Sequence, residues 1–140
     1  MKKPEFKLKA WGRMLERELE HRQALLKEGQ DYLLRVRTEA RFTRESMQRA
    51  SAEFGKEPTQ QQHFSEFYQR QELSLRATLE LAKRVETVIQ QLQAEVLETK
   101  QNLRRLELLE EQKLEEWKTE DARVSQEALD ELSILKFARR

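Results

Sequence analysis

The sequence predicts an all-α protein in which two long helices form an antiparallel coiled-coil hairpin with a C-terminal helical overhang. Charged residues make up 38% of the 140 residues and only three Gly and two Pro occur, a composition typical of long helices. Apolar residues recur at alternating three- and four-residue steps, which is the spacing of a coiled-coil seam. Gly and Pro come close together at one place only, which indicates one turn in a single coiled-coil domain spanning residues 1–140.

The first helix is expected from about residue 5 to about residue 54. Pro4 suits a first helical turn, where its missing N–H is not needed. Phe6, Leu8 and Trp11 can continue the seam upstream after a shift of register. The seam positions proper, all but three of them apolar, hold Leu15, Leu19, Arg22, Leu26, Gly29, Leu33, Val36, Ala40, Thr43, Met47, Ala50 and Phe54.

The turn is expected at about residues 55–60. Gly55 can end the first helix in a left-handed conformation. Pro58 prevents that helix from continuing, and Thr59 can cap the second helix.

The second helix is expected from about residue 60 to about residue 138. Its seam positions hold Phe64, Tyr68, Gln71, Leu75, Thr78, Ala82, Val85, Ile89, Leu92, Val96, Thr99, Leu103 and Leu106. Beyond these the phase slips, and the apolar positions are Leu109, Leu114, Trp117, Val124, Ala128, Leu132 and Leu135. Because no Gly or Pro intervenes, we interpret the slips as stutters within one continuous helix.

The two expected helices are unequal in length. If the turn centres near residue 58, Glu5 lies opposite about Gln112, and residues 113–140 have no partner within the chain. At a rise of 1.5 Å per residue this overhang is about 40 Å of helix. Its apolar residues are Leu114, Trp117, Val124, Leu132, Ile134, Leu135 and Phe137. A helix with such a stripe is expected to bind another protein.

Charge gives no indication of a nucleic-acid partner. The 27 Lys and Arg nearly balance the 26 Asp and Glu, so the net charge is +1 and partners must be recognised by local patches. Arg37, Arg41 and Arg44 share one helical face, but Glu39 and Glu45 dilute it. No nucleic-acid binding is therefore expected.

Catalysis, a cofactor and a metal site are not expected either. The chain has no Cys, no Gly-rich phosphate loop and no nucleophile elbow. Glu18 and His21 have the spacing of one half of a di-metal helical site, but His63 lacks the matching Glu three residues before it. A solvated charged face explains Glu18 and His21, and a di-metal enzyme would require bound iron or manganese.

A cytoplasmic location is expected. No stretch approaches the about 18 uncharged apolar residues of a membrane span. The opening residues 1–5 lead into charged sequence rather than into the apolar core of a signal peptide. The absence of Cys agrees with a reducing compartment.

Aromatic residues cluster at the start of the second helix, next to the turn. Phe64 and Tyr68 belong to the seam, whereas Phe67 falls outside it, as does Phe42 on the first helix. An aromatic side chain outside the seam is a candidate anchor for a partner. A partner site is therefore expected at the end of the hairpin that carries the turn.

The sequence also resembles the flagellar export protein FliJ family, the central-stalk and general chaperone components of type III secretion. The family shows an Arg/Leu/Glu-rich stretch, then an aromatic residue, then a closing Asp-Glu with a basic tail. Here these features are residues 104–113, Trp117, the pair Asp130 and Glu131 with Leu132, and residues 137–140. Residues 6–8, with Leu15 and Glu18, also look like the opening of the family.

The resemblance implies a non-catalytic component of the flagellar protein export apparatus, which serves flagellum biogenesis, motility and chemotaxis. Its partners would be a hexameric export ATPase, a membrane export gate and substrate chaperones, and it would lie at the cytoplasmic face of the inner membrane through these partners only. The residues at the ATPase ring would be Arg13, Arg17, Leu114, Trp117, Val124, Asp130, Glu131, Leu135, Phe137, Arg139 and Arg140. Those facing the gate would be Phe64, Phe67, Tyr68 and Leu75.

Two other readings stay open. One is the counterpart of this stalk in a virulence type III secretion system, which the residues do not separate from the flagellar one. The other is a structural coiled coil that dimerises along an exposed seam, which would show a mass that rises with concentration and no effect on an ATPase.

Overall fold

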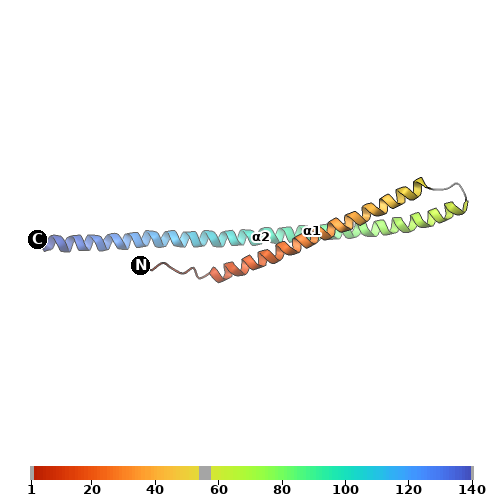
Figure 1. The fold of residues 1–140 in the computed structure, drawn as a ribbon. Coiled ribbons are helices and arrows are strands. Elements are labelled where there is room, and N and C mark those ends of the chain that lie inside the picture. The colour runs from red at the N-terminus through yellow and green to blue at the C-terminus, as the bar shows by residue number, and fades with distance from the viewer. Residues whose placement is uncertain (1, 54–57, 140) are drawn as a thin grey trace. The chain divides into compact units, whose positions relative to one another are not determined.

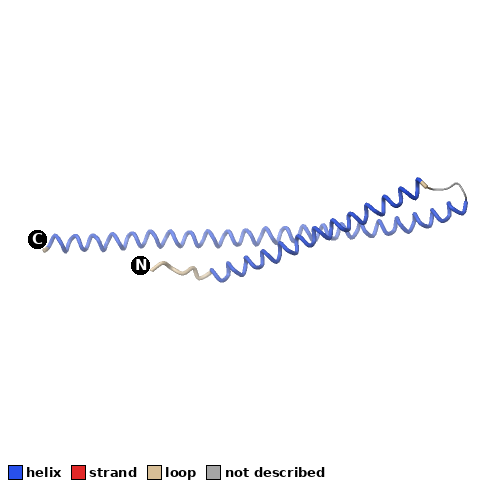
Figure 2. Tube along the Cα trace, in the orientation of Figure 1, coloured by secondary structure: helices blue, strands red, loops and turns tan. Residues whose placement is uncertain are grey.

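A computed structural model describes residues 2–53 and 58–139, with the side chains of residues 58 and 59 left out. These residues form two long α-helices and no strand: α1 (Lys9–Ala52), of 44 residues, and α2 (Pro58–Ala138), of 81 residues (Figures 1 and 2). The expected all-helical fold class, with two long helices packed against each other, is confirmed. No helix among the described residues combines the length and the apolar character that a membrane span requires.

The contacts divide the chain into two units. Glu20–Leu97 forms one of them, and Met1–Leu19 with Glu98–Arg140 forms the other. Both α1 and α2 contribute to each unit, and the two units are described separately below.

The core of the unit Glu20–Leu97 is the predicted seam. Its centre is a buried cluster of side chains from both helices, with further apolar residues packed around it: Leu33, Val36, Ala82 and Ile89, surrounded by Leu26, Leu81 and Val85. The polar side chains at seam positions are half-buried too, among them Arg22, Thr43 and Gln71. The seam positions therefore face the other helix even where they hold a polar residue.

Contacts across the seam run in one consistent order. The Arg22 guanidinium donates a hydrogen bond to the carbonyl oxygen of Glu95, with an N···O distance of 3.4 Å. Further along α1, the guanidinium of Arg37 forms an ion pair with Glu86 at 2.6 Å. As α1 advances, its partners on α2 come earlier in the chain. Both side chains of the Arg37 pair are about half exposed, so the pair contributes at most about 1 kcal/mol and apolar burial dominates.

Gly29 lies where the two helices approach closely. A Cβ atom added there would lie 3.4 Å from Cγ1 of Ile89 and 3.9 Å from Cδ1 of Leu92, which is ordinary van der Waals contact. A Cβ added at Gly12 would meet no atom within 4 Å. Neither glycine has a positive φ, so an L side chain fits the backbone at both positions.

Replacing Gly29 by Ala should raise the free energy of unfolding by about 1 kcal/mol, because Ala has the higher helix propensity and the methyl group finds contacts. Gly12→Ala is the control: its methyl group points into open space, so its effect on the free energy of unfolding comes from helix propensity alone. Thermal and urea melts of both variants followed by circular dichroism provide the test. A Gly29→Ala variant less stable than the wild type would mean that the helices approach more closely than the structure places them.

The second unit pairs the first residues of the chain with the middle of α2. Leu15 is buried, and Thr99 on α2 is the most buried side chain described, with 1% of its surface exposed. The Lys113 ammonium lies 5.8 Å from the centroid of the Phe6 ring, within the range of a cation–π interaction. The first residues are therefore held against α2 before α1 begins.

The observed helix ends differ from the predicted ones. α1 begins at Lys9 rather than at about residue 5, because the Lys9 N–H bonds the Phe6 carbonyl in a tight turn and the first α-helical bond runs from Gly12 to Leu8. α1 ends at Ala52, two residues before the predicted end.

The second helix begins at Pro58 instead of about residue 60, in agreement with the preference of Pro for a first helical turn. It ends at Ala138, as predicted. The expected cap at Gly55 and most of the turn lie outside the described residues.

The prediction that residues from 113 onward lack a partner is also wrong at its boundary. Lys113 contacts Phe6, and Leu114 lines a groove together with Pro4 and Arg13. This contact arises because residues 2–8 continue along α2 without being helical. The uninterrupted exposed stretch begins at residue 122 and continues to residue 139.

Candidate protein-binding site on the last turns of α2

The last turns of α2 carry large apolar side chains in an exposed position. Val124 is 38% exposed, Leu132 and Leu135 are each 55% exposed, and Phe137 is 83% exposed. We use the name C-terminal stripe for the residues that share one face of this helix at three- and four-residue steps, namely Leu114, Trp117, Val124, Ala128, Leu132 and Leu135. Within its unit, none of the described residues covers this stripe beyond residue 121.

Side-chain pairs along the helix support these turns in the absence of packing. Arg123 forms ion pairs with Glu120, three residues before it, and with Glu127, four residues after it. The Gln126 amide donates a hydrogen bond to the Asp130 carboxylate at 3.1 Å. Pairs at these three- and four-residue spacings each add a small stabilisation to a helix. The pairs that stabilise this part of the helix thus lie among its polar residues, and the C-terminal stripe stays available to a partner.

The Arg123 pair also changes the ionisation of its partners. Two nitrogens of the Arg123 guanidinium donate hydrogen bonds to the Glu120 carboxylate, and this lowers the pKa of Glu120 below its ordinary value, with the positive charge adding to the effect. The same contact raises the pKa of Arg123. The pKa of the Glu120 carboxylate is lower in the helix than in the unfolded chain. The ion pair therefore stabilises the helix fully at pH values above the pKa that Glu120 has in the unfolded chain. This stabilisation is lost as the pH falls through the lowered value.

Replacing Arg123 by Gln should raise the pKa of Glu120 back toward the ordinary value for a glutamate, because the hydrogen bond to the ionised carboxylate is removed. A carboxyl carbon NMR titration of the isotope-labelled chain measures this shift. Arg105→Gln is the matched control, since the Arg105 guanidinium bonds Asn102 and does not contact Glu120. If both variants left the Glu120 pKa at the wild-type value, the contact would be absent in solution.

Trp117 marks the point at which the C-terminal stripe becomes exposed. Its ring is half-buried, as is Leu114, whereas the sequence placed both in a fully unpartnered overhang. The indole nitrogen of Trp117 is inaccessible to solvent and has no hydrogen-bond partner among the described residues. Burying a donor in this way costs free energy, so the indole is better suited to packing than to polar recognition.

The charged residues expected at a partner ring lie in different places. Arg13 lines the same groove as Leu114, so the structure brings these two together. Arg17 is exposed outside that groove, and so are Asp130 and Glu131. Arg139 is exposed at the end of α2, and Arg140 lies outside the described residues.

The aromatic cluster near the start of α2 differs from its prediction. The rings of Phe64 and Tyr68 lie 5.8 Å apart between centroids, with their planes tilted by 41°. Phe67, expected outside the seam, is half-buried, whereas Tyr68 is 41% exposed. The step from Phe64 to Phe67 also fits a seam, so the sequence could not tell which aromatic residue turns inward. Leu75 is half-buried, which leaves Tyr68 as the exposed member of the predicted set.

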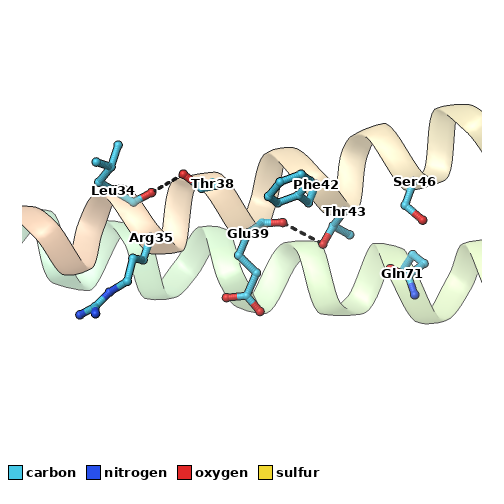
Figure 3. Close-up of a pocket in the computed structure, with 8 residues that line it drawn as sticks. All are labelled: Leu34, Arg35, Thr38, Glu39, Phe42, Thr43, Ser46 and Gln71. Carbon is cyan, nitrogen blue, oxygen red and sulfur yellow. Dashed lines mark hydrogen bonds between the residues drawn. The ribbon is translucent and has the colours of Figure 1, made fainter.

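A shallow groove on the outer face of α1 was not foreseen from the sequence. Leu34, Thr38 and Phe42 follow one another at four-residue steps, with Gln71 of α2 at the edge (Figure 3). Leu34 is 66% exposed and Phe42 is 58% exposed. The Thr38 hydroxyl donates to the Leu34 carbonyl at 2.8 Å, drawn as a dashed line in Figure 3, so its polar atom is satisfied within the helix. Two large apolar residues outside the seam, Leu34 and Phe42, lie eight residues apart, and this spacing was the signal that could have revealed the groove.

No three potential metal-ligating side chains gather anywhere in the described part of the chain. No protein-family model, no curated protein and no solved structure matches this chain. The functional assignment therefore depends on the geometry described above and on the resemblance identified in the sequence.

Proposed function

We propose that this protein is a non-catalytic stalk of the bacterial flagellar type III protein export apparatus. It forms an antiparallel coiled-coil hairpin, and the last turns of α2 insert into a hexameric export ATPase, promote its assembly and link its activity to export. The observation that carries the proposal is the C-terminal stripe: a helix that continues beyond its intramolecular partner with Val124, Leu132 and Leu135 exposed.

The order of contacts between the helices supports the hairpin. Arg22 bonds Glu95 and Arg37 pairs with Glu86, so partners on α2 move backward as α1 advances. Buried positions follow the seam on both helices, as knobs in a coiled coil do. An antiparallel pair leaves the longer helix with an end of its own, and that end is the proposed insertion element.

Physical chemistry makes the C-terminal stripe a suitable assembly element. A helix with its side chains is about 10–12 Å across, so a single helix can enter the central opening of a protein ring. Burying one Leu or Val side chain stabilises a complex by about 1.5–3 kcal/mol. Several such residues on one face suffice to bias subunits toward the assembled ring, even after the entropic cost of association.

The other end of the hairpin is proposed to contact the export gate. The exposed Tyr68, whose ring lies against that of Phe64 in a tilted arrangement, is the best-placed anchor, because aromatic side chains dominate binding sites. Contacts with the gate and with substrate chaperones would place the protein at the cytoplasmic face of the inner membrane. This role serves flagellum biogenesis and motility.

The direct test is reconstitution with the purified cognate ATPase. The double variant Leu132→Ser with Leu135→Ser should lower hexamer formation and stimulated ATP turnover at least tenfold, because two buried apolar anchors are lost. Its matched control is Leu129→Ser with Ile134→Ser. These two residues are 58% and 68% exposed but lie off the C-terminal stripe, and their loss should leave both measurements near the wild-type values. Equal effects of the two double variants, or none from either, would contradict insertion by this face.

A structural coiled coil that pairs with a second copy is the second candidate, and the groove at Leu34 and Phe42 favours it. In that case sedimentation of the purified chain should show a mass that rises with concentration. The Phe42→Ser variant should then sediment with the mass of a monomer. The stalk proposal expects a mass that does not change with concentration and is the same for Phe42→Ser.

A further inference from the structure

Residues 2–14 form the most strongly basic segment of this nearly neutral chain. Lys2, Lys3, Lys7, Lys9 and Arg13 stand against one acidic residue in this segment, Glu5, which gives a net charge of +4. The whole chain carries +1, so the rest of it carries −3. A charge asymmetry of this kind can orient a protein at a charged surface even when the total charge is small.

The cations of this segment are available to an external partner. All four lysines are exposed, and none of them forms an ion pair within the part of the chain that the structure describes. Several cations elsewhere form ion pairs, as Arg37 does with Glu86 and Arg104 does with Glu107. The segment therefore presents unneutralised ammonium groups.

Apolar side chains lie beside these cations. Trp11 is 52% exposed and Met14 is 54% exposed, and their three-residue spacing makes them neighbours on one side of α1. Phe6 is half-buried, with the Lys113 ammonium over its ring, so it holds residues 2–8 in place rather than binding outward. The exposed surface of residues 2–14 thus combines lysine side chains with the indole of Trp11 and the thioether of Met14.

We propose that residues 2–14 bind directly to the surface of an anionic phospholipid bilayer. Lysine ammonium groups attract anionic headgroups, while an indole settles at the boundary between headgroups and acyl chains. Duplex nucleic acid is a poorer fit, because four of the five cations are Lys rather than the Arg that suits bidentate phosphate and base contacts, and because nucleic acid offers Met14 no apolar layer. The inference goes beyond the proposed function, which reaches the membrane through protein partners only.

The test uses the purified full chain and vesicles, without any ATPase, so its outcome is independent of the stalk proposal. The chain should co-sediment with vesicles of equal parts phosphatidylglycerol and phosphatidylcholine, but not with vesicles of phosphatidylcholine alone. Since each Lys near an anionic surface strengthens binding about fivefold, the variant Lys3→Gln with Lys7→Gln and Lys9→Gln should bind about 100-fold more weakly. Salt at about 1 M should also release the chain, because it shortens the Debye length to about 3 Å.

A control variant with the same change in net charge is available. Lys27, Lys83 and Lys100 are exposed in the helices, far along the chain from the basic segment, and their replacement by Gln should leave vesicle binding near the wild-type value. Circular dichroism verifies that both triple variants remain helical. Equal losses of binding in the two triple variants would mean that overall charge, not this segment, is responsible, and would overturn the proposal.

Tryptophan emission provides a second measurement. Adding anionic vesicles should shift the emission of the wild-type chain to shorter wavelength, because Trp11 enters a less polar layer. Trp11→Phe should abolish the shift, since Trp117 is the remaining indole and its nitrogen is already shielded from solvent. A shift that persists in Trp11→Phe, equal binding to neutral vesicles, or displacement from vesicles by duplex DNA would each overturn the proposal.

Discussion

Burial of the seam between α1 and α2 is the interaction on which the rest of the structure depends. Ion pairs along the surface are numerous but exposed, and each contributes little. The buried cluster around Val36 and Ile89, by contrast, removes apolar surface from water at about 25 cal/mol per Å². Isolated helices are marginal in water, so without this burial neither helix would be expected to persist at its full length.

The inequality of the helices follows from this constraint and gives the molecule its candidate function. α1 has 44 residues and α2 has 81, so α1 cannot cover the whole of α2. Residues 2–8 extend the cover a little further without forming helix, as the contact of Phe6 with Lys113 shows. Beyond residue 121 the helix is supported by its own ion pairs, with Arg123 at their centre. Pairs along a single helix therefore support the C-terminal stripe beyond this point, in place of the packing that supports the seam.

Much of the fold could be predicted from the sequence because a heptad pattern fixes which face of a helix is buried. The pattern identified even polar seam residues correctly: Arg22 and Thr43 are half-buried, and Thr99 is buried. It failed where two spacings fit equally well, as with Phe67 and Tyr68. It also failed at the start of α1, where the Lys9 N–H bonds the Phe6 carbonyl in a tight turn and residues 2–8 lie outside the helix.

The candidate site was predictable in part. Unequal helix lengths indicated an exposed apolar end, but not that non-helical residues would cover Lys113 and Leu114, since periodicity describes helices only. The groove at Leu34 and Phe42 could not be predicted from the heptad pattern, because that pattern describes the seam and these two residues lie outside it.

Amide hydrogen exchange measured on the chain alone and on the chain mixed with the proposed partner, a hexameric export ATPase, tests the central claim most directly. In the free chain, amides of residues 122–138 should exchange much faster than those around Ala82 and Ile89, because local opening there breaks no buried contacts. On addition of the ATPase the exchange of residues 122–138 should slow markedly, with little change around the seam. Protection of this segment in the dilute free chain, or exchange unchanged by the ATPase, would contradict the account.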